Sequence, residues 1–191
     1  MKTLSLRLAT LAAGIVLLAV GASGQSSNDA ELTAQLKKLF PSAATFSAKA
    51  GTPAHYKAFG PAAAGKEGEL LGLAYWTTEL EPLERGFDGP IKMLVGLSPA
   101  GEITGVLVTD HREPYGYFSV DLPDWPKQFE GKSIRDSFKV GADVDAISRA
   151  TITVQSASRA IRNSSRKIAR AHLAPPAPPA GGAPAPAAAA Q

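Results

Sequence analysis

Hydrophobic positions in the first part of the chain recur at the spacing of a helix. Pro41 sets the end of that helix, because the residue before a proline is pushed away from helical geometry. Either Ser27 or Asn28 can cap its start. The apolar side of the predicted helix carries Leu32, Leu36, Leu39 and Phe40.

In the middle of the chain, the helical spacing of apolar residues gives way to the alternation of apolar and other residues that is typical of a β-strand. Residues 70–78 are rich in strand-forming side chains and predict a buried strand. Residues 91–97 alternate as a half-buried strand does, and residues 103–108 predict its partner. Between them, Pro99 and Gly101 suit the second and fourth positions of a type I turn. The sequence therefore predicts an antiparallel hairpin.

The last third of the chain combines a loop region with a long helix. Residues 110–131 contain three prolines and five aromatic residues, so we expect short turns packed against the core. Strands followed by a terminal helix indicate an α+β fold, a single domain with a mostly antiparallel sheet and flanking helices. The apolar positions that predict the terminal helix are Val154, Ala157, Ile161 and Ile168.

Composition sets the ends of the predicted domain. Lys2 and Arg7 precede an apolar run over residues 8–22, which is typical of a secretory signal peptide over residues 1–24; the alternative is a retained N-terminal anchor. Residues 174–191 are almost entirely Ala, Pro and Gly and predict a disordered tail. Residues 25–173 remain as the folded domain, and we expect an exported, periplasmic location.

Cysteine content and charge narrow the class of function. The chain contains no cysteine, so redox chemistry would require a bound cofactor, and the spacing of its three histidines predicts no metal site. Six basic and no acidic residues follow Asp145. They indicate either a solvated helix face or a surface for phosphate, an acidic partner or anionic lipid. Nucleic acid is not an expected partner, because an aromatic–basic reading motif is lacking.

Hydroxyl groups gather where the last predicted helix begins. Ser148, Thr151 and Thr153 lie before or within its first turn. Free backbone amides and the helix dipole favour an anion at such a place, so a phosphate site is one interpretation. Ser and Thr are also common helix caps, and capping is the other interpretation.

A family resemblance bears on that choice. Residues 148–153 resemble the Ser/Thr-Gly-Ala-Thr/Ser-x-Thr motif of the FMN-binding domain family, which includes covalent-flavin subunits of sodium-pumping NADH:quinone reductases and of Rnf-type complexes. The resemblance implies that a separate flavin transferase joins the phosphate of FMN to Thr153. The residues at the motif positions are Ser148, Arg149, Ala150, Thr151, Ile152 and Thr153.

Further segments extend the resemblance over nearly the whole predicted domain. These segments, taken in their order along the chain, look most like the periplasmic flavin domain of the regulator proteins that support nitrous oxide reductase. Arg149 departs from the glycine of the family, and its side chain would interfere if the backbone needs a positive φ or close approach to the phosphate. Alternatively, its guanidinium would pair with the phosphate. The segments are residues 39–41, 51–56, 90–96, 101–106 and 111–114.

The loop after the second hairpin strand supplies further site candidates. His111 or Glu113 would hydrogen-bond the flavin ring or ribityl chain, or instead form a loop salt bridge with Arg112 or another neighbour. For Asp145, at the start of the motif region, we expect a structural role. The aromatic residues that would either stack on the flavin or anchor the core are Tyr115, Tyr117 and Trp125.

The sequence thus predicts a monomeric, periplasmic electron carrier with covalent FMN and no catalytic residues of its own. It would exchange electrons with membrane-bound or periplasmic redox proteins. One alternative is a flavin-free envelope binding protein on the same fold, with the basic helix as its contact surface. Another is a protein that binds FMN reversibly.

Overall fold

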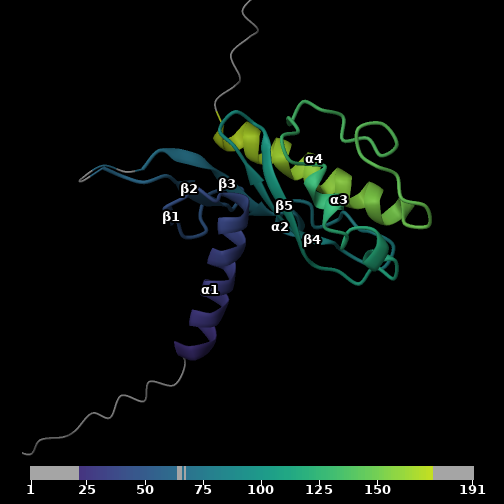
Figure 1. The fold of residues 1–191 in the computed structure, drawn as a ribbon, viewed down its shortest axis with the longest axis horizontal. Helices are drawn as coiled ribbons and strands as arrows, with labels where there is room; N and C mark the ends of the chain where they lie inside the picture. The colour runs from purple at the N-terminus through teal and green to yellow at the C-terminus, as the bar shows by residue number, and fades with distance from the viewer. Residues whose placement is uncertain (1–21, 64–65, 67, 174–191) are drawn as a thin grey trace, which may run out of the picture.

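A five-stranded antiparallel sheet forms the centre of the fold (Figure 1). The computed structural model describes residues 22–63, 66 and 68–173, so most of the predicted signal peptide and the whole predicted tail lie outside the described residues. Each strand pairs with the next one in the chain. The strands are β1 (Thr45–Phe46), β2 (Tyr56–Phe59), β3 (Leu70–Trp76), β4 (Lys92–Leu97) and β5 (Ile103–Asp110).

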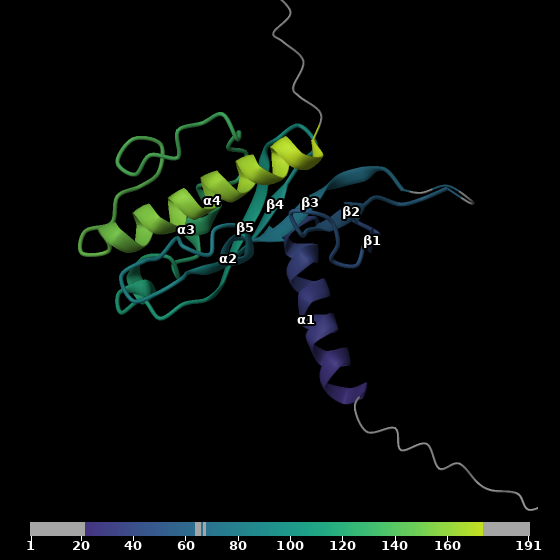
Figure 2. The same cartoon turned by 180° about the vertical axis from the view of Figure 1, so that it is seen from behind.

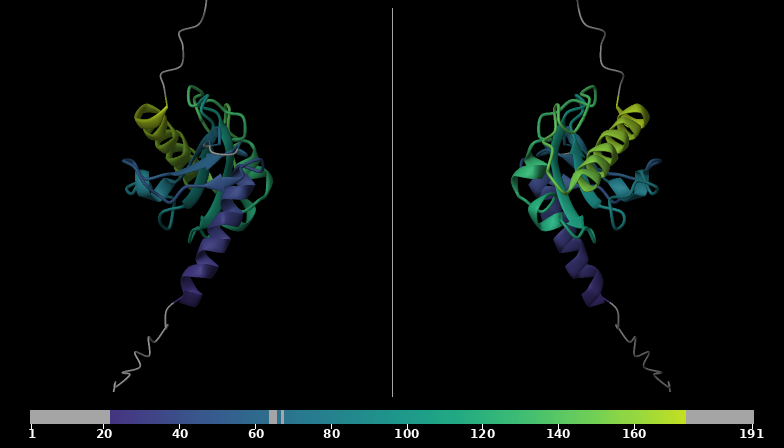
Figure 3. Two further views of the ribbon diagram at one scale, coloured as in Figure 1. Left: turned by 90° about the vertical axis from the view of Figure 1, so that its left-hand side faces the viewer. Right: turned by 90° about the vertical axis from the view of Figure 1, so that its right-hand side faces the viewer.

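Two long helices lie on opposite sides of this sheet, as the views in Figures 1, 2 and 3 agree. They are α1 (Ala22–Leu39) and α4 (Thr151–His172), and shorter helical turns form α2 (Thr77–Leu80), η1 (Gly116–Phe118) and α3 (Asp124–Lys127). The predicted α+β fold is therefore confirmed. Within the described part of the chain, no helix combines the length and the apolarity that crossing a membrane requires.

Helix α1 packs on the sheet through its C-terminal half, where Leu36, Leu39 and the following Phe40 are buried in a cluster with Trp76 and Leu94. Leu32 is partly buried against the same cluster. The rest of the helix extends beyond the sheet (Figures 1 and 2). The predicted start at Ser27 or Asn28 is wrong, because α1 already includes Ala22.

Helix α4 covers the other face and closes the larger core. The predicted apolar side is confirmed, since Val154, Ala157, Ile161 and Ile168 are all buried there. The buried Tyr75 hydroxyl of β3 donates a hydrogen bond of 2.7 Å to Ser165 Oγ of the helix. Apolar packing and one buried polar contact therefore fix α4 against the sheet.

The predicted hairpin is present as β4 and β5, with the turn closed by a hydrogen bond of 3.0 Å from Gly101 N–H to the Ser98 carbonyl. The expectation that β4 is half-buried is wrong. Met93 and Val95 face the α4 core, and Leu94, on the other face, packs in the cluster with α1. Both faces of β4 are covered because each long helix takes one of them.

Basic residues of α4 bind loops of the same chain. Arg166 donates hydrogen bonds of 2.8 Å to the carbonyls of Ile134 and Asp136. Lys167 contacts the Leu80 carbonyl at 2.7 Å and Glu81 at 2.8 Å. For Arg166 and Lys167, the interpretation of the basic residues after Asp145 as a solvated helix face is therefore wrong, because these two side chains hold neighbouring segments against the helix.

Candidate functional site

The turn that leads into α4 has a backbone shape that favours glycine. Ala150 N–H donates to the Ile147 carbonyl at 3.1 Å, which closes a four-residue turn with Arg149 in its third position. Arg149 has a φ of 68°. A positive φ at this position is the signature of turns that prefer glycine. The family motif places glycine here, so the turn gives a physical reason for that preference.

The start of α4 presents backbone donors without a side-chain cap. Ala150 is the N-cap residue and supplies no capping hydrogen bond. The first bond of the helix runs from Val154 N–H to the Ala150 carbonyl at 3.0 Å, so the preceding amides of the first turn have no partner within the helix. The capping interpretation of the hydroxyl cluster is therefore wrong.

The three hydroxyl residues differ in exposure. Ser148 and Thr151 are exposed, together with Arg149 and Ile152, whereas Thr153 is only 2% exposed. Hydroxyls, a guanidinium and free amides at one helix start form a donor set that suits a phosphate. The part of the site that fits FMN on chemical grounds thus lies at the surface, with Thr153 beneath it.

The carboxylate of Glu113 lies against Thr153. The Thr153 hydroxyl donates a hydrogen bond to Glu113 Oε2. The carboxylate also accepts the N–H groups of Phe87 and Asp88, each at 2.9 Å. Glu113 is 6% exposed, and burying a carboxylate is costly unless donors satisfy it. These three donors do so, and they join the segment after β5, the 86–89 loop and α4 at one point.

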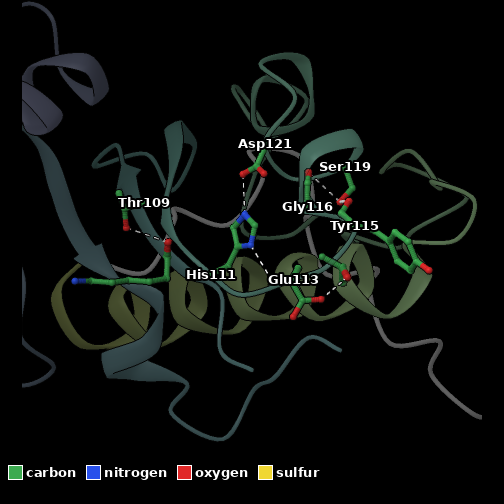
Figure 4. Close-up of polar contacts among 9 residues, drawn as sticks. Thr109, His111, Glu113, Tyr115, Gly116, Ser119 and Asp121 are labelled. Atoms are coloured by element: carbon green, nitrogen blue, oxygen red, sulfur yellow. Dashed lines mark hydrogen bonds and ion pairs between the residues drawn. The ribbon is translucent and has the colours of Figure 1, made fainter. Parts of the chain in front are cut away.

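His111 orients the same segment (Figure 4). Its Nδ1 accepts the N–H of Glu113 at 3.0 Å, and its Nε2 lies 2.7 Å from Asp121 Oδ1. Because Nδ1 is an acceptor, the ring proton belongs on Nε2, where it is donated to Asp121. His111 therefore fixes the backbone of Glu113 and does not itself reach Thr153.

The structure sorts the remaining predicted residues. Neither His111 nor Glu113 pairs with Arg112, which donates to the Asp88 carbonyl at 3.2 Å. The alternative of a polar pairing with a loop neighbour does fit His111, whose Nε2 contacts Asp121. Trp125 is buried and anchors the core, whereas Tyr115 is 44% exposed and its ring turns away from Glu113 (Figure 4). The remaining two aromatic and acidic candidates, Tyr117 and Asp145, are both exposed.

The 86–89 loop is the part of the site that sequence reasoning missed. Gly86 N–H bonds the Gly89 carbonyl at 2.7 Å, which turns the next two amides toward Glu113. A Cβ on Gly86 would lie 2.5 Å from Glu113 Oε1, so only glycine permits this approach. Two glycines within four residues were the available signal, although they do not reveal which carboxylate the loop surrounds.

Other polar groups lie away from Thr153. A cavity of about 240 Å³ lies on the Asp121 side of His111. The rings of His55 and His172 are 4.1 Å apart although they are distant in sequence. Across the described ranges, no group of three His, Cys, Asp or Glu residues could hold a metal ion.

Fold and site together define an α+β domain whose last helix begins with a phosphate-compatible surface above a buried Glu–Thr pair. Residues 86–165 match the family model described as FMN-binding domain. The match includes the 86–89 loop, Glu113 and Thr153. The family resemblance is confirmed, while the nearer resemblance to the nitrous oxide reductase regulators stays a prediction.

Curated relatives also match part of the chain, and each is named as a subunit of an ion-translocating oxidoreductase complex. The relative from Haemophilus influenzae (strain PittEE) is 34% identical over 116 residues, which covers 56% of this chain and 52% of that protein. Those from Vibrio vulnificus and Shewanella baltica are 33% and 35% identical over 88 residues, covering 41% of this chain and 42% of each relative. The chain thus spans about half the length of the curated relatives it matches.

Proposed function

We propose that this protein is an electron carrier in which FMN is joined through its phosphate to Thr153. The observation that carries the proposal is the position of Thr153: within the FMN-binding domain match, at the uncapped start of α4, and bonded to a buried carboxylate. The flavin supplies the redox chemistry when bound, and the protein supplies attachment and orientation.

Residues beside Thr153 would hold the two ends of the cofactor. The free amides of the first turn, with Ser148 and Arg149, suit the phosphate. Three exposed apolar side chains suit an aromatic ring system. They are near Glu113 or Thr153 in the sequence, or belong to the 86–89 loop that binds Glu113. They are Phe87, Tyr115 and Ile152, which are 66%, 44% and 54% exposed.

Partners and location complete the proposal. The relatives are named as subunits of an oxidoreductase complex, which supports membrane-bound or periplasmic redox proteins as electron partners. Export is supported by the charged start and the apolar run over residues 8–22. A separate flavin transferase as a further partner is supported by the motif over residues 148–153.

The intact mass of protein coexpressed with a flavin transferase tests the attachment. We expect an increment of one esterified FMN on the wild-type chain, and none on Thr153→Ala. Thr151→Ala is the matched control, since Thr151 is an exposed hydroxyl in the same turn, and it should retain the increment. An increment that Thr153→Ala keeps and Thr151→Ala loses would move the attachment to Thr151.

A specific observation also favours the flavin-free alternative. Thr153 is 2% exposed, so its hydroxyl is not accessible until the turn above it opens. If the mass stays unmodified in every sample and the purified protein is colourless, the binding-protein alternative replaces the proposal. Yellow protein that releases its flavin on denaturation would instead establish reversible FMN binding.

A further inference from the structure

We infer that Glu113 accepts the proton of Thr153 when FMN is esterified to that hydroxyl, an inference that rests on the proposed function. The contact that carries it is the hydrogen bond from Thr153 Oγ1 to Glu113 Oε2. A neutral hydroxyl is a weak nucleophile, and an adjacent base is the usual way in which proteins activate one. Here the acceptor chain itself provides that base.

The carboxylate is held in place for this step before any flavin arrives. The amides of Phe87 and Asp88 fix both oxygen atoms of Glu113 at 2.9 Å, and His111 fixes its backbone N–H at 3.0 Å. The side chain is 6% exposed, so water does not compete freely for it. Glu113 therefore faces the Thr153 hydroxyl in a single, supported geometry.

The neighbouring ionisable groups do not offer the same chemistry. Both ring nitrogens of His111 are engaged, Nδ1 by the Glu113 amide and Nε2 by Asp121 at 2.7 Å. Arg112 points to the Asp88 carbonyl and, as a guanidinium, cannot accept a proton. Glu113 is thus the group whose acceptor atom touches the reacting oxygen.

The step balances with a flavin donor that carries a phosphoanhydride bond. Thr153 Oγ1 forms a bond to the phosphorus of the FMN phosphoryl group, and its proton passes to Glu113 Oε2. The bond from phosphorus to the bridging oxygen breaks, and the leaving phosphate takes the electron pair. Glu113 then releases the proton to water or to the leaving phosphate, and no oxidation or reduction occurs.

The rate of flavinylation of the full chain by the transferase, followed by intact mass, tests this role. Glu113→Gln keeps the size of the side chain and removes the base, so we expect a loss of roughly 100-fold or more in rate. Arg112→Ala is the matched control, because Arg112 also tethers the 86–89 loop but does not touch Thr153. Removing that single hydrogen bond should change the rate less than about tenfold.

A conservative variant and a folding measurement complete the test. Glu113→Asp keeps a carboxylate but withdraws it from Thr153, so its rate should lie between those of the wild type and Glu113→Gln. Thermal unfolding shows whether each variant is folded at the assay temperature. If Glu113→Gln is unfolded there, the rate of Glu113→Asp serves as the test of the inference. A wild-type rate in either folded Glu113 variant, or equal losses in Glu113→Gln and Arg112→Ala, would overturn the inference. An unmodified wild-type chain would instead overturn the proposed function.

Discussion

Arg149 carries a long side chain on a left-handed backbone, with a φ of 68°. Phe138, at 52°, has the same handedness but is buried in the core, and its N–H donates to Asp143 Oδ2 at 2.8 Å. Arg149 is exposed and gains no comparable packing. The backbone strain at Arg149 is therefore the better target for a stabilising substitution.

Arg149→Gly should stabilise the fold. The left-handed conformation costs a residue with a Cβ about 1–2 kcal/mol, and glycine removes this cost. The greater flexibility of glycine in the unfolded chain offsets part of the gain in stability. We expect a rise of about 0.5–1 kcal/mol in the free energy of unfolding, measured in urea. Arg149→Ala keeps the Cβ and serves as the control, with little change expected. A lower stability of the glycine variant would show that the guanidinium contributes more than the strain costs.

At the scale of elements, α4 does more than cover the sheet. Its Arg166 binds two carbonyls of the segment between Ile134 and Asp136 at 2.8 Å each. That segment has little regular structure, so side chains of the helix supply hydrogen bonds that a strand would otherwise supply. The irregular region before the site is thus ordered by the helix that follows it.

Arg166→Ala should weaken this connection. Loss of two hydrogen bonds to backbone carbonyls should lower the free energy of unfolding by about 1–2 kcal/mol. Arg170→Ala, at an exposed position of the same helix, should change it by less than about 0.5 kcal/mol. Chemical denaturation of both variants checks the difference. Equal effects would mean that helix propensity or net charge, and not the carbonyl contacts, determines the loss.

The elements show which parts of the structure the sequence can predict. The β4–β5 hairpin and the apolar side of α4 are determined by local period and turn chemistry, so both are predictable. The burial of β4 on both faces is not, because it depends on α1 packing from a distant part of the chain.

The candidate site likewise has one part that the sequence can predict and one part that it cannot. The sequence identifies Ser148 to Thr153 because the motif is contiguous. It does not identify the pairing of Glu113 with Thr153, since 40 residues separate them and the 86–89 loop supplies backbone amides whose direction no side-chain pattern encodes.

Across the whole molecule, the Tyr75 hydroxyl joins sheet and helix through Ser165 at 2.7 Å. Complete burial raises the pKa of Tyr75 far above its ordinary value, although the hydrogen bond with Ser165 opposes this. The folded protein therefore keeps the phenol neutral where the unfolded chain would ionise it. Above about pH 10 the unfolded state loses this proton and is favoured, so stability declines as the pH rises.

Tyr75→Phe should make the protein less sensitive to alkali. At neutral pH we expect a loss of about 1 kcal/mol for the missing hydrogen bond. Above about pH 10 the gap to the wild type should shrink, because only the wild type carries the cost of keeping this phenol neutral. Urea unfolding at neutral and alkaline pH measures both effects. Tyr117→Phe, at a side chain 69% exposed, is the control, and a constant gap across pH would contradict the prediction.

The sequential order of the strands has a consequence for the time at which the site comes into being. Pairing among the five strands involves residues up to Asp110, so the sheet can assemble before the final part of the chain has been synthesised. Thr153 meets Glu113 only after α4 has docked on that sheet. An enzyme that requires this pair would therefore modify finished domains and pass over nascent or truncated chains. Cofactor attachment would then also distinguish completely folded chains from incompletely folded ones.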